Sequence, residues 1–223
     1  MNISKDTLSF LKELKKNNDR DWFQENKRRY QKANEDVRDF LDALIPEIAK
    51  FDPSVRGVEA KDCMFRIYRD VRFSKNKEPY KTNLGGYITS GGRKAMKAGY
   101  YVHIEPGRSM LAGGAYMPPA EWLKAIRKEI HYNSEELHKV IRSKTFKENF
   151  GELEGERLKT SPRDYPADHP EIELLRMKSL TAFHELKDSQ LKSADFGKHA
   201  TKVFKALKPL NDYLNMAMDG DES

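Results

Sequence analysis

The sequence predicts an α+β domain, in which an antiparallel sheet packs against N-terminal and C-terminal helices. Helical periodicity fills the first part of the chain and returns after residue 118, whereas the middle has short segments of β type. This grouping of helices, then strands, then helices is typical of the α+β class. The 223 residues suffice for one domain over 1–218, and the acidic residues 219–223 are expected to form a frayed tail.

The N-terminal part predicts two helices. The first covers 4–17, because Ser4 is a suitable N-cap and leucines recur on one side after it. The second covers 21–49 and carries an apolar stripe with a repeat of about 3.6 residues. Pro46 lies near its end and is expected to kink the helix or to begin its last turn separately.

The central part predicts an antiparallel meander. Residues 63–73 and 99–105 are rich in aromatic and β-branched residues, and glycine pairs bracket a short strand at 87–90. The Pro-Gly pair at 106–107 is a turn signal. Residues 109–116 are therefore expected to return antiparallel and to complete a hairpin.

The rest of the chain returns mainly to helices. The prolines at 118–119 open one helix, and Ser134 is a suitable N-cap for another. The polar stretch 144–170 is expected to run along the surface, with a short strand near 157–159. The last predicted elements are a helix at 172–177, a strand at 180–186 and a helix at 196–216.

Composition excludes several classes of protein. No apolar run approaches the roughly 20 residues of a membrane helix, and the N-terminus lacks the apolar core of a signal peptide. The single cysteine, Cys63, excludes an internal disulfide and a multi-cysteine metal site, and it is interpreted as a packed residue. The six histidines have no metal-ligand spacing, and no phosphate-loop or dinucleotide motif is present. We therefore expect a soluble, cytoplasmic protein with no membrane partner, metal or cofactor.

The basic charge is concentrated in one segment. Residues 61–97 hold ten lysines and arginines against three acidic residues, an excess of seven, whereas the whole chain has a formal charge of +6. A local field of this kind can concentrate an anionic partner. The alternative is a solvated basic face, which is the usual state of a run of charges.

Arg69 breaks the alternation of the predicted 63–73 strand. It falls on the face of four apolar residues, which are Phe65, Ile67, Val71 and Phe73. Either a bulge shifts the register, or the side chain is drawn beneath the sheet, where an unpaired charge costs several kcal/mol. In both cases Arg69 needs a carboxylate or an anionic ligand. The alternative to a ligand is an internal ion pair with Asp70, Glu105 or a helix acid.

Two predicted strands each present a polar and aromatic face. On the 63–73 strand this face holds Arg66, Tyr68 and Arg72, and on the 99–105 strand it holds Tyr101, His103 and Glu105. Arginine and tyrosine suit planar stacking and forked contacts to phosphate or carboxylate. A water-exposed face, common in antiparallel sheets, is the alternative.

Further cations border this face. Lys75 and Lys81 lie in the loop after the first strand, and Arg176 and Lys178 border the predicted last strand. A solvated helix end is the alternative for the last two. The candidate ligand-binding set is therefore Arg66, Tyr68, Arg69, Arg72, Lys75, Lys81, Tyr101, His103, Arg176 and Lys178.

His103 and Glu105 are the candidates for acid–base chemistry. They share a strand face and are about 7 Å apart by strand rise, which leaves room for a ligand or a water molecule between them. The alternative is a histidine that makes an ordinary hydrogen bond on the sheet face.

Three functions fit these observations. We favour the binding of a small phosphorylated or carboxylated ligand in a basic cleft on the sheet, with His103 as the acid–base group if the site is catalytic. The second is a nucleic-acid-binding module that uses the same residues and continues to Arg93, Lys94 and Lys97, with affinity that falls steeply with salt. The third is a non-catalytic interaction protein whose basic face meets an acidic partner. The acids Asp70 and Glu78 among the cations favour the first.

The chain also resembles a known family. It carries FRIYRDVRFSK at 65–75, PYK at 79–81, GYYVHIEPG at 99–107, GG at 113–114, and DHP at 168–170 followed by LRMK at 175–178. In this order the blocks resemble the bacterial and fungal family known as domain of unknown function 2461. The resemblance spans nearly the whole chain and implies one full-length domain. The family has no assigned activity, so the resemblance carries no residue's role over to this chain.

Overall fold

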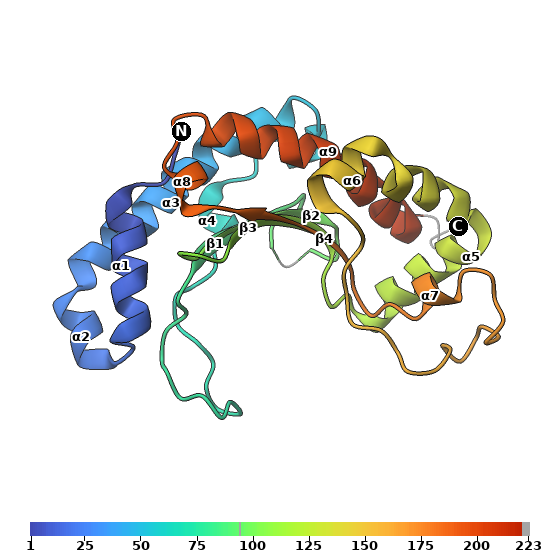
Figure 1. Ribbon diagram of the computed structural model, residues 1–223, viewed down its shortest axis with the longest axis horizontal. Helices are drawn as coiled ribbons and strands as arrows, with labels where there is room; N and C mark the ends of the chain where they lie inside the picture. The colour runs from blue at the N-terminus through green and yellow to red at the C-terminus, as the bar shows by residue number, and fades with distance from the viewer. Residues whose placement is uncertain (94, 220–223) are drawn as a thin grey trace. The chain divides into compact units, whose positions relative to one another are not determined.

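The computed structural model describes residues 1–93 and 95–219 and confirms the α+β class (Figure 1). Within these residues, four strands form one antiparallel sheet in the order β1-β2-β3-β4. The strands are β1 (Leu84–Ile88), β2 (Gly99–Ile104), β3 (Ser109–Ala115) and β4 (Leu180–Leu186). The helices are α1 (Lys5–Lys16), α2 (Arg20–Glu25), α3 (Lys27–Ala49), α4 (Ala60–Cys63), α5 (Ala120–Arg142), α6 (Lys144–Phe150), α7 (Ile172–Leu175), α8 (Asp188–Leu191) and α9 (Phe196–Asp219), with a 3₁₀ turn η1 (Pro53–Val55).

The chain divides into two compact units. The first comprises Met1–Arg93, Tyr101–Leu111 and Glu185–Lys202. The second comprises Lys94–Tyr100, Ala112–His184 and Val203–Ser223. Of the acidic tail predicted at 219–223, residues 220–223 lie outside the described part of the chain.

The first unit begins with α1, as predicted. The Ser4 hydroxyl accepts the backbone N–H of Thr7 at 3.1 Å and caps the helix. Arg29 of α3 donates both terminal nitrogens to the Glu13 carboxylate of α1, at 2.7 and 2.8 Å. This forked ion pair ties the two helices together and lowers the pKa of Glu13 to about 2.

The predicted 21–49 helix is in fact two helices. α2 ends at Glu25 and α3 begins at Lys27, because Asn26 between them leaves helical geometry, with φ −99° and ψ 12°. The Asn26 side chain instead donates to the carbonyl of Trp22 at 2.9 Å. Pro46 stays inside α3 and does not end it.

The β2–β3 hairpin is confirmed, and β1 begins three residues before the predicted 87–90 strand. Gly85 explains how closely β1 and β2 approach each other. A Cβ atom at this position would lie 2.2 Å from the carbonyl oxygen of Val102, so only glycine allows this pairing.

The predicted 63–73 strand is wrong. After α4 the chain forms a long loop that extends away from β1 and returns at Leu84 (Figure 1). The bridges Met64↔Gly86 and Tyr68↔Tyr80 are isolated. The predicted inward face is not a buried face, since Ile67 is buried but Phe65 is 37% and Phe73 is 96% exposed. Without a continuous apolar side, the segment has no face that a sheet could bury.

The second unit contains α5, which merges two predicted helices. Its backbone kinks at Asn133, one residue before the predicted N-cap Ser134. The helix α6, within the stretch predicted as surface chain, buries Phe146 and Phe150. The short strand predicted near 157–159 is only an isolated bridge between Arg157 and Met177.

The helix α9 is held on the sheet by a buried amide in the second unit. The Asn211 side chain donates to the carbonyl of Gly99 at 3.0 Å and accepts the N–H of Gly114 at 3.1 Å. β4 and α9 thus match the predicted strand at 180–186 and the predicted helix at 196–216.

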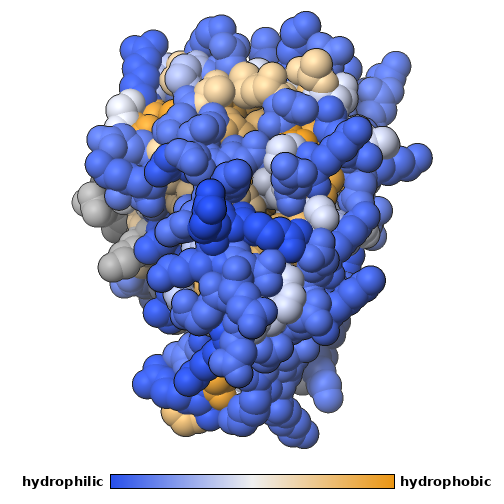
Figure 2. All heavy atoms as spheres, turned by 90° about the vertical axis from the view of Figure 1, so that its left-hand side faces the viewer, coloured by the Kyte–Doolittle hydropathy of each residue, from blue (hydrophilic) through white to orange (hydrophobic). Residues whose placement is uncertain are grey.

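The face of the molecule on the side of α1 and α2 is mostly polar. Figure 2 looks onto the side that carries α1 and α2 and shows a mainly hydrophilic surface, with hydrophobic side chains in small areas. Among residues 1–93 and 95–219, no helix has both the length and the apolar character needed to cross a bilayer.

Candidate functional site

The strand β2 and the residue after it present alternate side chains to different surroundings, as the sequence predicts. Val102 and its neighbours on one face are fully buried in the core. Tyr101, His103 and Glu105 share the other face, where Tyr101 is half-buried. His103 and Glu105 are only 9% and 6% exposed, so this face is not open to water there.

These three side chains form a continuous hydrogen-bonded chain. The Tyr101 hydroxyl lies 2.9 Å from Nδ1 of His103, and Nε2 of His103 lies 3.2 Å from Oε2 of Glu105. The two side chains therefore contact each other directly, where the spacing along the strand predicts room for a ligand between them. Strand rise gives the separation of the backbones, but both side chains lean along the strand and meet.

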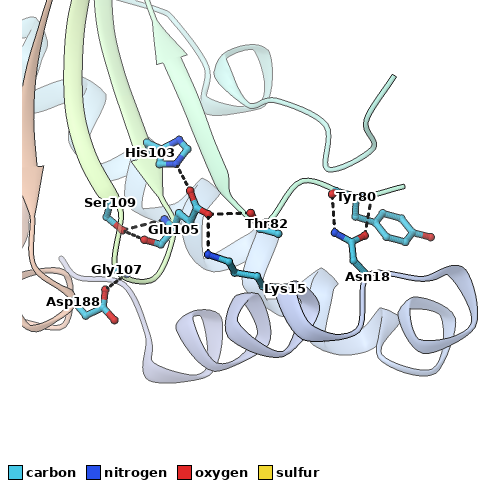
Figure 3. Close-up of polar contacts among 9 residues, drawn as sticks. All are labelled: Lys15, Asn18, Tyr80, Thr82, His103, Glu105, Gly107, Ser109 and Asp188. Carbon is cyan, nitrogen blue, oxygen red and sulfur yellow. Dashed lines mark hydrogen bonds and ion pairs between the residues drawn. The ribbon is translucent and has the colours of Figure 1, made fainter. Parts of the chain in front are cut away.

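The Glu105 carboxylate has two more partners, which come from other elements (Figure 3). Thr82 donates its hydroxyl to Oε1 at 3.0 Å, and the ammonium of Lys15 on α1 lies 3.9 Å from the same oxygen. Ser109 closes the turn, since its hydroxyl accepts the backbone N–H of Glu105 and donates to its carbonyl. The carboxylate is thus buried with its oxygens satisfied.

The electrostatics of the pair fix the protonation of both groups. Burial raises the pKa of Glu105, but hydrogen bonds from His103 and Thr82 outweigh it and hold the pKa below its usual value. Burial lowers the pKa of His103, and the attraction of Glu105 offsets this only in part. An ionised carboxylate requires Nε2–H of a neutral His103 to donate to it. The lone pair of Nδ1 is then directed at the Tyr101 hydroxyl.

Positive side chains surround Phe65, next to Tyr101. The Lys81 ammonium lies 5.3 Å and the Arg93 guanidinium carbon 5.9 Å from the centroid of the Phe65 ring. The Phe65 ring meets the Tyr101 ring edge-on at 6.0 Å between centroids. Arg93 also donates to the carbonyl of Met64, which fixes its guanidinium there.

Arg66 adds a third charge, and we call Arg66, Lys81 and Arg93 the cation cluster. Burial lowers the pKa of Lys81, and repulsion from Arg66 and Arg93 lowers it further. Within the described part of the chain, none of the three forms an ion pair with a carboxylate.

The other two predicted arginines of the loop already have acidic partners. Arg69 donates to the carbonyl of Glu78 at 3.0 Å and lies 3.7 Å from its carboxylate. Arg72 makes a forked pair with Asp70, at 3.0 and 2.7 Å. The partner of Arg69 is thus a loop acid, not Asp70 or Glu105.

The remaining predicted residues are placed as follows. Tyr68 is 49% exposed and lies against the rings of Phe23 and Tyr80, and Lys75 is exposed. Arg176 and Lys178 belong to the second unit. There Arg176 donates to two backbone carbonyls and contacts Glu173, and Lys178 pairs with Glu156 at 3.0 Å.

Four residues of the site were not among the predicted ones. Phe65 lies on the inward face of the predicted 63–73 strand, and Arg93 is predicted to contribute only to nucleic-acid binding. Thr82 and Lys15 reach Glu105 through the tertiary structure, so no local pattern marks them. The only feature of the sequence that could have indicated Thr82 is its position next to Lys81, which belongs to the predicted binding set.

Three other features bear on the chemistry. Cys63 is buried as expected, and burial raises the pKa of its thiol to about 11, which makes it unreactive. In the described residues, no three histidine, cysteine or acidic side chains come together in a group that could hold a metal ion. A surface hollow of about 440 Å³ between α3 and the 55–58 segment contains none of the predicted site residues.

Comparison with family models gives one match, to the family described as conserved hypothetical protein (DUF2461), over residues 6–213. The chain belongs to this family. No curated protein and no solved structure matches it. In this DUF2461 protein the cation cluster and the Tyr101–His103–Glu105 chain both lie within the matched residues. The resemblance expected from the sequence is thus confirmed.

Proposed function

We propose that the protein binds a small ligand carrying a phosphate or carboxylate group at the cation cluster, beside Tyr101. One observation supports this above all. Lys81 and Arg93 contact the Phe65 ring, and the charge of Arg66 acts on Lys81. None of these three cations pairs with a described carboxylate. In the same loop, Arg69 and Arg72 do have acidic partners.

An anion would relieve the repulsion within this cluster. Like charges that are held together without a counter-charge destabilise one another, and the lowered pKa of Lys81 has this cause in part. Arg66 and Arg93 offer forked donors that match phosphate and carboxylate oxygens. Lys81 is half-buried, so its contact with an anion would be less screened than one on the open surface.

A specific observation favours single-stranded nucleic acid as the second candidate. Phe73 is 96% exposed at the outer part of the loop, with the Arg72 guanidinium 5.9 Å from its ring centroid. An exposed aromatic ring beside cations is suited to stack on a base. Nucleic acid would engage this exposed ring, whereas a small anion would need only the cation cluster.

A thermal-shift screen against inorganic phosphate, sugar phosphates, nucleotides, small carboxylates and short oligonucleotides tests the proposal. At 100 times its dissociation constant, a ligand stabilises the protein by about 2.7 kcal/mol. We expect a small anion to raise the melting temperature of the wild type and not of Lys81→Met. The control is Lys61→Met, since Lys61 is exposed and already paired with Glu59 at 2.6 Å.

The two candidates give different results in this screen. A shift with oligonucleotides alone, lost in Phe73→Ser and steeply reduced by salt, would favour nucleic acid. A shift with no member of the panel would reject both.

We also place the protein in the cytoplasm as part of the same proposal, because its single cysteine is a buried free thiol and thiols stay reduced in that compartment.

A further inference from the structure

We propose that Tyr101 is the catalytic base of the site, with His103 and Glu105 as positioning residues that accept and stabilise its proton. This rests on the proposed function, because the cation cluster would hold the ligand beside the Tyr101 ring. The sequence alone favoured His103 for the acid–base role. The structure instead buries His103 behind Tyr101, so a ligand would meet the phenol before the imidazole.

The polarity of the hydrogen bonds gives the direction of proton flow. The Glu105 carboxylate accepts a hydrogen bond from Nε2–H of His103, so Nδ1 of the neutral ring can only accept. The partner of Nδ1, at 2.9 Å, is the Tyr101 hydroxyl. A hydroxyl, an imidazole and a buried carboxylate in this order form the arrangement that activates a nucleophile or base in hydrolytic triads. Here a phenol takes the place of the serine hydroxyl.

The proton balance of the step is simple. A hydroxyl or water at the bound anion gives its proton to the Tyr101 oxygen, while the phenol O–H proton passes to Nδ1 of His103. The products are an alkoxide or hydroxide at the ligand, a neutral phenol, and an imidazolium that is paired with the Glu105 carboxylate. No metal, oxidant or reductant takes part.

Charged groups from every neighbouring element bear on this step. The cation cluster on the 65–93 segment stabilises the negative charge that forms on the attacking oxygen of the bound ligand. Lys15 from α1 and Arg108 from the β2–β3 turn act on Glu105, and Arg108 also disfavours the imidazolium. Among the described residues, Glu105 is the negative group in contact with His103, and Thr82 also donates to its carboxylate.

A purely structural network would not need this order of groups. These groups run from a buried carboxylate, through a buried imidazole, to a half-buried phenol whose ring meets Phe65, the ring that Lys81 and Arg93 contact. Burying an ionised carboxylate on a sheet face is costly compared with an apolar residue of similar size. A reactive group at the outer end accounts for that cost.

The reactivity of the Tyr101 phenol can be measured before any substrate is known. The reagent is 4-(fluorosulfonyl)benzoate, which carries a carboxylate for the cation cluster. The phenol oxygen attacks sulfur, the S–F bond breaks, fluoride leaves, and the proton passes to His103. Peptide mass spectrometry of the full-length protein then gives the modification rate of each tyrosine. Tyr116 and Tyr132, which are 73% and 70% exposed, are internal references in the same molecule.

We expect Tyr101 to be modified at least about 10-fold faster than Tyr116 and Tyr132, since general-base assistance contributes roughly 10²–10⁴-fold. Glu105→Gln and His103→Gln should remove this advantage and move the pH profile of the Tyr101 rate toward that of the exposed tyrosines. A wild-type Tyr101 rate no higher than the references overturns the proposal, and this result needs no variant to fold.

A neutral reagent, benzenesulfonyl fluoride, separates the inference from the proposed function. If the anion site and the activated phenol both exist, Lys81→Met slows modification of Tyr101 by the carboxylate reagent and not by the neutral one. Fast modification by both reagents, unaffected by Lys81→Met, would uphold the activated phenol and reject the anion site. Slow modification by both, in a protein that still binds phosphate, would reject the activated phenol alone.

Discussion

The Glu105 carboxylate can be buried because three donors surround it. His103 and Thr82 donate to it at 3.2 and 3.0 Å, and the Lys15 ammonium lies 3.9 Å away. A buried charge that is hydrogen-bonded and paired escapes most of the cost that an isolated one would carry. The carboxylate in turn selects the neutral form and the tautomer of His103 on which the proposed chemistry depends.

Stability should therefore depend on pH through His103. Its folded-state pKa lies below the ordinary value near 6.5, so between the two values the unfolded chain binds more protons. The contribution is fully present above the ordinary value and is lost as pH falls through the folded-state pKa. We expect the free energy of unfolding in urea to fall between about pH 7 and pH 5, and this fall to be smaller in His103→Gln.

An identical pH dependence in His103→Gln and the wild type would show that His103 is not buried as a neutral group.

At the level of residues, the sequence was sufficient for Tyr101, His103 and Glu105. Side chains alternate between the two faces of a strand, so these three residues share one face, and the folded structure keeps this alternation. It was not sufficient for the contacts of Glu105, because Lys15 comes from α1 and Thr82 from the end of a loop. Whether Arg69 and Arg72 would be paired was also undetermined, since several acids were within reach in the sequence.

Among the elements, the loop between α4 and β1 carries Phe65, Arg66, Lys81 and Thr82 of the site. Its last part is held by Asn18, whose side chain donates to the carbonyl of Tyr80 at 3.0 Å and accepts its N–H at 3.1 Å (Figure 3). Phe23 of α2 stacks on the Tyr80 ring at 3.9 Å between centroids. These contacts set the position of Lys81 and Thr82, which follow.

Asn18→Ala should loosen this end of the loop. It removes both hydrogen bonds to Tyr80, and each is expected to contribute about 0.5–1.5 kcal/mol. We expect faster amide hydrogen exchange across 79–83, measured by mass spectrometry, and weaker binding of the anion. Asn17→Ala is the control, because the Asn17 side chain bonds only within α1. Unchanged exchange in Asn18→Ala would mean that the loop is held by other contacts.

The contact of α9 with the sheet offers a test in the second unit. Asn211→Ala removes the two buried hydrogen bonds that the side chain makes, to the carbonyl of Gly99 and from the N–H of Gly114. We expect a loss of about 1–3 kcal/mol in the free energy of unfolding, measured by urea denaturation. Asp212→Ala, which removes only an exposed pair with Lys208, should cost less than about 1 kcal/mol. Equal losses in the two variants would contradict the account.

The elements that were predicted well have strong periodicity and clear end signals. Ser4 caps α1, and the Pro-Gly turn joins β2 to β3, as the sequence indicates. The 63–73 segment failed because its aromatic residues suggested a strand, while its side chains are engaged elsewhere. Phe65 is surrounded by cations, and Phe73 is in water. Local propensity for a strand is overridden when no buried face is available.

On the scale of the whole molecule, the distribution of charge is the feature with functional meaning. The 61–97 segment has an excess of seven positive charges, which the rest of the chain does not share. The acids of the segment neutralise Arg69 and Arg72 but leave Arg66, Lys81 and Arg93 without ion pairs among the described residues. These three cations form a local cluster, which suits a small ligand better than a long polyanion.

The most direct test of the account is the affinity for inorganic phosphate, measured by isothermal titration calorimetry at low salt. We expect Lys81→Met and Arg66→Met each to weaken binding about tenfold or more, because a charge-assisted hydrogen bond contributes roughly 1.5–3 kcal/mol. Lys61→Met should bind as the wild type does. Equal affinity in all four proteins, or no binding by the wild type, would contradict an anion site at the cation cluster.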